Sequence, residues 1–290
     1  MAEFLQFLFS GLTVGAVYAL VALGFTLIYN ASDVVNFAQG EFVMLGGMVT
    51  VFTAAAGVPL PLAAVIAICA AVAAGLLLHR LAIEPARGAS AVTLIIITIG
   101  ASILVRGIAQ VVFDKQFHKL PPFTGDTPVD VFGAAVQPQS FWVIGGAAAV
   151  VIALYGFLER TVLGKAVLAT AANRLAASLV GINTSTIMAL AFGGSAAIGA
   201  IAGILITPIT LTSYDVGTLL ALKGFAAAML GGMGNPLGAV VGGLLLGLLE
   251  AFGAGYLSST YKDAFAFLVI LVVLFAAPNG LFGRRVVERV

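Results

Sequence analysis

Apolar stretches long enough to cross a lipid bilayer recur along the whole chain, and they restrict the fold more than any other feature. A transmembrane helix needs about 20 predominantly apolar residues, because each residue adds about 1.5 Å of rise. Charged residues make up only 9% of the 290 residues, whereas a soluble domain contains about 25%. The sequence therefore predicts an all-α polytopic membrane protein with a single transmembrane domain over residues 1–290.

The hydropathy pattern predicts about eight or nine transmembrane helices, separated by short polar segments. The longest polar segment, residues 113–139, contains four prolines, so we expect no continuous helix there. The expected spans are residues 5–29, 42–57, 60–82, 90–112, 140–158, 185–207, 216–232, 236–256 and 263–279.

Basic residues predict the orientation, because Lys and Arg concentrate in the cytoplasmic loops of membrane proteins. They cluster after the third, fifth and ninth expected spans, so an even number of spans separates the clusters. Placing all three clusters in the cytoplasm puts the N-terminus outside and the C-terminus inside. The clusters contain Arg80 and Arg87, then Arg160, Lys165 and Arg174, and finally Arg284, Arg285 and Arg289.

Polar residues interrupt the apolar pattern between the first two expected spans, in the stretch "YNASDVVNFAQGE" at residues 29–41. Ionisable groups inside a membrane are costly and usually face the interior of the helix bundle. One interpretation is a re-entrant or irregular segment near residues 30–41, beside a path for solute. An ordinary loop in contact with water at the cytoplasmic face is the alternative. The candidate lining or gating residues are Asp33, Asn36, Gln39 and Glu41.

Arg106, Lys223 and Glu250 are charged residues within the expected spans. Lys223 is a further candidate for the solute path, and it either reaches outward to the interface or pairs with an acid inside the bundle. We expect Arg106 to extend to the outer end of its span, and Glu250 to reach the outer interface. The possible partners of Lys223 are Asp33, Glu41, Asp215 and Glu250.

Glycines recur four positions apart, a spacing that lets membrane helices approach closely. Gly11 and Gly15, and also Gly243 and Gly247, follow this pattern and predict a compact helical body. The segment "MLGGM" occurs at residues 44–48 and again at 229–233. Inverted repeats are common in transporters, although so short a segment also recurs by chance.

The sequence carries no motif for catalysis or for a cofactor. It contains no phosphate-binding loop of the G-x-x-x-x-G-K-[ST] type, no H-E-x-x-H motif and no pair of cysteines. We therefore expect no catalytic residues, no metal site, no enzymatic activity and no ATP hydrolysis by this chain itself. No basic tract indicates nucleic-acid binding.

Three blocks in order resemble the permease subunits of bacterial ABC importers for branched-chain amino acids, of the LivH type, over essentially the whole length. The first runs from Gly11 to Gly46 and contains Tyr29 followed by "NFAQGE" at residues 36–41. The third is "LKGFAAAMLGGMGNPLGAVVGG" at residues 222–243. The second, at residues 164–182, resembles the inner-face loop of the family and contains Gly164, Lys165, Ala166, Ala169, Ala171, Asn173, Ala176, Ala177, Gly181 and Ile182.

The resemblance implies a multi-pass protein of the bacterial inner membrane that moves branched-chain or related amino acids. Its implied partners are a second related permease, cytoplasmic ATPase subunits that use the ATP, and a periplasmic or extracellular solute-binding protein. Residues 160–182 would be the segment that couples to the ATPase. The residues expected to carry this coupling are Gly164, Lys165, Asn173, Arg174 and Gly181.

Two other classes of function remain open from the residues alone. An ion-coupled secondary transporter would use the buried acids and a possible inverted repeat. A structural subunit would pack a complex without moving a solute. Uptake driven by an ion gradient without ATP would indicate the first, and normal transport after replacement of the polar residues at 29–48 would indicate the second.

Overall fold

The computed structural model describes residues 2–283, and each of the nine expected spans is a helix within this range. The expected basic tail at Arg284, Arg285 and Arg289 lies outside the described residues. The elements are α1 (Ala2–Ser32), α2 (Gln39–Ala55), α3 (Leu60–Leu78), the π-helical turn η1 (His79–Ile83), α4 (Ala91–Phe113), β1 (Val129–Val131), β2 (Ala134–Val136), α5 (Pro138–Arg160), α6 (Val162–Ala172), α7 (Arg174–Leu179), α8 (Thr184–Thr210), α9 (Val216–Gly231), α10 (Pro236–Tyr256) and α11 (Lys262–Ala276).

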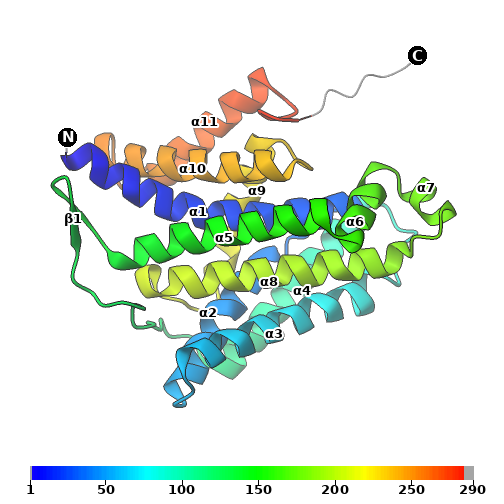
Figure 1. The fold of residues 1–290 in the computed structure, drawn as a ribbon, viewed down its shortest axis with the longest axis horizontal. Coiled ribbons are helices and arrows are strands. Elements are labelled where there is room, and N and C mark those ends of the chain that lie inside the picture. The colour runs from blue at the N-terminus through cyan, green and yellow to red at the C-terminus, as the bar shows by residue number, and fades with distance from the viewer. Residues whose placement is uncertain (1, 284–290) are drawn as a thin grey trace.

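Six helices among residues 2–283 are long and apolar enough to cross a membrane: α1, α3 with η1, α4, α5, α8 and α10. In Figure 1, α1, α5, α8 and α10 run along the long direction of the molecule. The N-terminus and β1 lie at one end, here named the hairpin end, and α6 and α7 lie at the other, named the α7 end (Figure 1). The fold is therefore the predicted polytopic helical bundle, in which α2, α9 and α11 are shorter than the other expected spans.

The centre of the bundle is α1. Every residue from Gly15 to Ile28 is buried, as expected for a helix that is apolar on all sides. Neighbouring helices α5, α8, α9 and α10 pack around it. Its closest approach is to α10, where a Cβ atom added to Gly247 would lie 2.3 Å from the Gly15 Cα atom. The two glycine pairs seen in the sequence therefore face one another and let the two backbones touch.

Residues 33–38 fold back into the bundle after α1 ends. By Gln39 the chain has returned alongside Gly24, well before the end of α1, and a Cβ atom on Gly24 would lie 2.0 Å from Gln39 Nε2. Helix α2 therefore begins inside the protein and runs toward the hairpin end beside α8. This is the re-entrant course expected for residues near 30–41.

Helix α9 crosses the interior between the starts of two other helices. Gly217 in its first turn packs on Gly40 at the start of α2, while Gly231 at its end packs on Gly238 in α10. The second copy of "MLGGM" leaves this helix at Gly232, where φ is 102°. The first copy is helical throughout in α2, so the two copies differ in conformation and do not support a repeat.

Candidate functional site

The re-entrant segment keeps its polar backbone groups satisfied through side chains of its surroundings. The Phe37 amide donates to Thr98 Oγ1 over 3.2 Å, and the same hydroxyl lies 3.4 Å from the Val35 carbonyl oxygen. Asn36 is fully buried, and its Oδ1 atom accepts a hydrogen bond from the Ala38 amide at 3.1 Å. Irregular backbone is tolerated at membrane depth only when protein covers it or water reaches it, and here α4 supplies part of the cover.

Gln39 ties the start of α2 to α8 and α1. Its Nε2 atom donates to the Ser195 carbonyl oxygen at 3.2 Å, and its Oε1 atom accepts from the Ser195 hydroxyl. Ser195 Oγ also lies 2.9 Å from the Gly24 carbonyl oxygen. The side chain of Gln39 therefore holds the re-entrant segment at a fixed depth in the bundle.

Glu41 in the first turn of α2 forms an ion pair with Arg106 of α4. Arg106 Nη2 and the Ser102 hydroxyl both donate to Glu41 Oε1, over 3.1 Å and 2.7 Å. Glu41 is only 1% exposed, whereas the Arg106 side chain is 29% exposed. The expectation that Arg106 extends away to the outer end of its span is wrong, because a buried carboxylate needs a cation close by.

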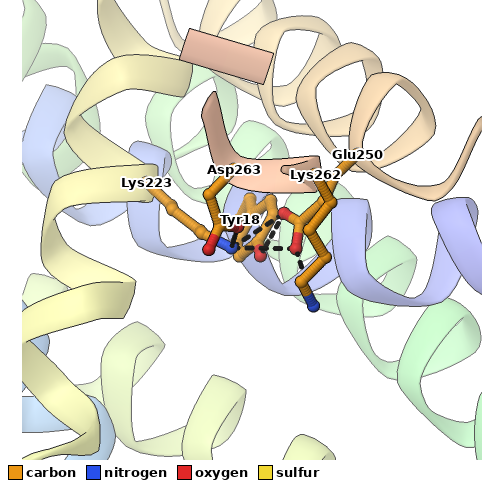
Figure 2. Close-up of polar contacts among 5 residues, drawn as sticks. All are labelled: Tyr18, Lys223, Glu250, Lys262 and Asp263. Carbon is orange, nitrogen blue, oxygen red and sulfur yellow. Dashed lines mark hydrogen bonds and ion pairs between the residues drawn. The ribbon is translucent and has the colours of Figure 1, made fainter. Parts of the chain in front are cut away.

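Lys223 lies in a second cluster of charges, formed by four helices (Figure 2). Its Nζ atom is 2.8 Å from Glu250 Oε1 and 2.7 Å from Asp263 Oδ1. The Tyr18 hydroxyl donates to Glu250 Oε2 at 2.8 Å, and Lys262 Nζ lies 3.5 Å from Glu250 Oε1. Two lysines and two carboxylates balance in charge, so the cluster joins α1, α9, α10 and α11 without a net charge.

The five residues predicted to line the path thus fall into three places. Asn36, Gln39 and Glu41 come together at the start of α2, and Lys223 belongs to the separate cluster with Glu250. Asp33 is exposed, with φ at 56°, in the turn that leaves α1. Glu250 is buried against Lys223, so the expectation that it reaches the outer interface is wrong.

The predicted coupling segment forms α6 and α7 at the α7 end (Figure 1). Thr161 caps α6 by accepting a hydrogen bond from the Gly164 amide at 2.9 Å. A Cβ atom on Gly164 would lie 2.0 Å from the Phe157 carbonyl oxygen, so only glycine permits this turn. Asn173 caps α7 by accepting from the Ala176 amide at 2.9 Å, and Gly181 with φ at 89° ends the segment.

Sequence reasoning singled out the polar residues of this segment and missed its apolar ones. Leu175, Leu179 and Val180 are 71%, 79% and 78% exposed, whereas the Asn173 side chain is used as a helix cap. Lys165 is exposed, and Arg174 is partly buried. The signal was present, because leucines four positions apart lie on one face of a helix.

A polar contact fixes the neighbouring turn between η1 and α4 to the start of α8. The Ser185 hydroxyl donates to Glu84 Oε1 at 2.7 Å, and Arg87 Nη2 lies 2.6 Å from the same atom. The hydrogen bond from Ser185, with the charge of Arg87, holds the pKa of the Glu84 carboxyl below its usual value. Glu84 therefore stays ionised at neutral pH and links α8 to the turn that precedes α4.

Comparison with known proteins identifies what the chain resembles over nearly its full length. The family described as "Branched-chain amino acid transport system / permease component" matches residues 7–274. The high-affinity branched-chain amino acid transport system permease LivH of Escherichia coli K12 is 36% identical, over 99% of this chain and 98% of that protein. BraD of Pseudomonas aeruginosa, a permease with the same description, is 34% identical over the same shares.

More distant matches share the architecture. The ribose import permease RbsC of Escherichia coli K12 is 28% identical, over 92% of this chain and 84% of that protein. A chain of PsaBC from Streptococcus pneumoniae, solved in complex with a Fab, superimposes with a TM-score of 0.51 at 15% identity. That superposition covers 97% of this chain and 94% of the other, so the two chains share the fold over nearly their full lengths.

Proposed function

Because the chain belongs to the family of permease components of branched-chain amino acid transport systems, we propose that it is the transmembrane subunit of an ATP-driven importer. Its solutes are branched-chain or related amino acids, and the whole chain acts as one permease domain. It lies in the bacterial inner membrane with the α7 end in the cytoplasm. The basic residues Arg160, Lys165 and Arg174 at that end support this orientation.

The observation that carries the proposal is the exposed apolar surface of α7, formed by Leu175, Leu179 and Val180. This surface lies on a short helix beyond the ends of α5 and α8 (Figure 1). Exposed apolar patches outside the lipid-facing surface mark protein contacts. A cytoplasmic ATPase subunit is the partner that would cover it.

In this assembly the chain pairs with a second related permease, and a solute-binding protein delivers the amino acid from outside. The ATPase subunits bind and hydrolyse ATP, so the permease needs no cofactor and performs no reaction. Because α6 follows α5 directly and α8 follows α7 closely, a displacement of α6 and α7 moves both helices. That motion would change the solute path beside α1 and the re-entrant segment.

Ion-coupled transport is the competing mechanism, and the buried charges argue against it. Glu41 and Glu250, the buried carboxylates among residues 2–283, are paired with Arg106 and Lys223. A transported cation would have to displace the side-chain cation that each carboxylate already has within 3.1 Å. The buried acids therefore serve better as structural ion pairs than as ion-coupling sites.

Purification from the native membrane in mild detergent tests the proposal. We expect ATPase subunits and a second permease to co-purify, and ATP hydrolysis to rise when a binding protein loaded with leucine is added. The double substitution Leu175→Ser with Leu179→Ser should release the ATPase, while Phe132→Ser at the hairpin end should not. Isolation of the chain alone, with no ATPase subunit, would contradict the proposal.

A further inference from the structure

A pocket of about 300 Å³ lies between α1, α8 and α9. Its volume is at the lower end of the range for small-molecule sites, which begins near about 300 Å³. One wall is the ring of Tyr18, whose hydroxyl reaches Glu250 in the charge cluster. The pocket therefore adjoins the Lys223 cluster, although the lysine is not among its lining residues.

The walls of this pocket are mainly apolar, and polar residues lie at the end of α8 and just before α9. Val17, Ile206 and Leu220 are among the apolar lining residues. Ser213 and Asp215 are among the polar ones. The pocket is therefore amphipathic: most of its lining is apolar, and one carboxylate, that of Asp215, lies at its edge.

The Asp215 carboxylate lines the pocket without an ion-pair partner among the described residues. Its Oδ1 atom accepts a hydrogen bond from the Ser213 hydroxyl at 2.6 Å. No ion pair among residues 2–283 includes Asp215. The residue is exposed, so its carboxylate can accept hydrogen bonds from a bound cation.

We infer that this pocket receives the transported amino acid inside the permease, with the α-ammonium group on Asp215 and the aliphatic side chain between Val17, Ile206 and Leu220. Charge-assisted hydrogen bonds to a carboxylate are about twice as strong as neutral ones, which favours an ammonium group over a hydroxyl. The aliphatic walls favour a branched side chain over a polar one. An acyl chain of a lipid fits less well, because an apolar tail forms no hydrogen bond with Asp215 or Ser213.

This inference rests on the proposed function, and it adds a site that discriminates solutes after the binding protein has released them. The test measures binding of radiolabelled leucine to the purified permease complex without binding protein. Two competitors separate the groups of the ligand: 3-methylbutylamine keeps the ammonium, and 4-methylpentanoate keeps only the carboxylate. We expect the amine to displace leucine and the acid to fail.

Substitutions in the chain complete the test. Asp215→Asn should weaken leucine binding at least about tenfold, the loss expected when one charge-assisted hydrogen bond is removed. Val216→Phe should weaken it by filling the pocket, while Asp126→Asn, an exposed acid of the loop before β1, should leave it unchanged. Co-purification of the ATPase subunits with each variant shows that it has folded.

Two results would overturn the inference: no displaceable leucine binding to the unsubstituted complex, or equal leucine binding by the Asp215→Asn variant. Uptake by the complete importer separates this failure from failure of the proposed function. If the Asp215→Asn complex bound leucine normally and the importer took up leucine with ATP, the pocket would not be the leucine site, whereas the proposed function would stand. An intact complex that imports no aliphatic amino acid would contradict the proposed function itself.

Discussion

Lys223 and Glu250 form a buried ion pair in which the lysine Nζ atom lies 2.8 Å and 2.9 Å from the two carboxylate oxygens. The pair joins α9, which crosses the interior, to α10, which packs on α1. Asp263 at the start of α11 approaches the same nitrogen at 2.7 Å (Figure 2). One lysine therefore positions three helices at once.

Replacement of Lys223 by methionine should destabilise the protein by about 3 to 5 kcal/mol, because it leaves Glu250 buried without its main cation. The double substitution Lys223→Met with Glu250→Met should recover most of this loss. Thermal unfolding in detergent measures both, with Lys115→Met on an exposed loop as the control. Unfolding of the single variant at the temperature of the unsubstituted protein would contradict the assigned role of the pair.

The Glu41–Arg106 pair should respond unequally to loss of either partner. Arg106→Met leaves a fully buried carboxylate with only Ser102 as its partner, and should cost about 3 kcal/mol. Glu41→Gln keeps a hydrogen-bonding group at the buried position, and the partly exposed arginine can reach polar surroundings. That variant should cost only about 1 kcal/mol. If both variants lost the same unfolding free energy, the difference in burial between Glu41 and Arg106 would not determine the cost of losing a partner.

Gly40→Ala should prevent α2 and α9 from packing, because the added Cβ atom would lie 1.9 Å from the Gly217 carbonyl oxygen. Gly100 in α4 has no neighbouring atom within 4 Å of such a Cβ, so Gly100→Ala is the matched control. Alanine there should stabilise the helix by up to about 1 kcal/mol. The two variants are compared by their expression level and unfolding temperature. A Gly40→Ala protein as stable as the unsubstituted one would contradict the close approach of α2 to α9.

Leu179→Ser should reduce ATP hydrolysis that depends on the loaded binding protein, because it removes part of the surface proposed to contact the ATPase. It should leave the unfolding temperature unchanged, since Leu179 is mostly exposed. If Leu179→Ser lowered the unfolding temperature and left ATP hydrolysis normal, Leu179 would stabilise the fold and would not contact the ATPase.

Asn173→Ala should lower the free energy of unfolding by about 1 kcal/mol, because it removes the cap of α7.

Hydropathy and glycine spacing predicted the helices and their close packing, because both features depend on local pattern. They did not predict which helices pack together, such as α1 and α10 at Gly15 and Gly247. The polar cluster at residues 29–41 indicated a re-entrant segment only together with the family resemblance. The local pattern gave wrong positions for the side chains of Arg106 and Glu250. Each has a partner from a distant part of the sequence, and the cost of an unpaired buried charge decides its position.

The coupling segment shows a second limit of sequence reasoning. The sequence predicts Asn173 as a contact residue because it is polar within a segment of small residues, and that contact stays a prediction. The structure uses its side chain as a cap for α7. Exposure of Leu175 and Leu179 depends on how α7 lies beyond α5 and α8, which the helical period does not determine.

Uptake of labelled leucine into proteoliposomes tests the central claim most directly. The vesicles contain this chain with its co-purified partners, and a binding protein is added outside. We predict uptake that requires ATP in the compartment facing the α7 end, and that does not respond to a proton or sodium gradient. Uptake driven by an ion gradient without ATP would contradict the importer mechanism.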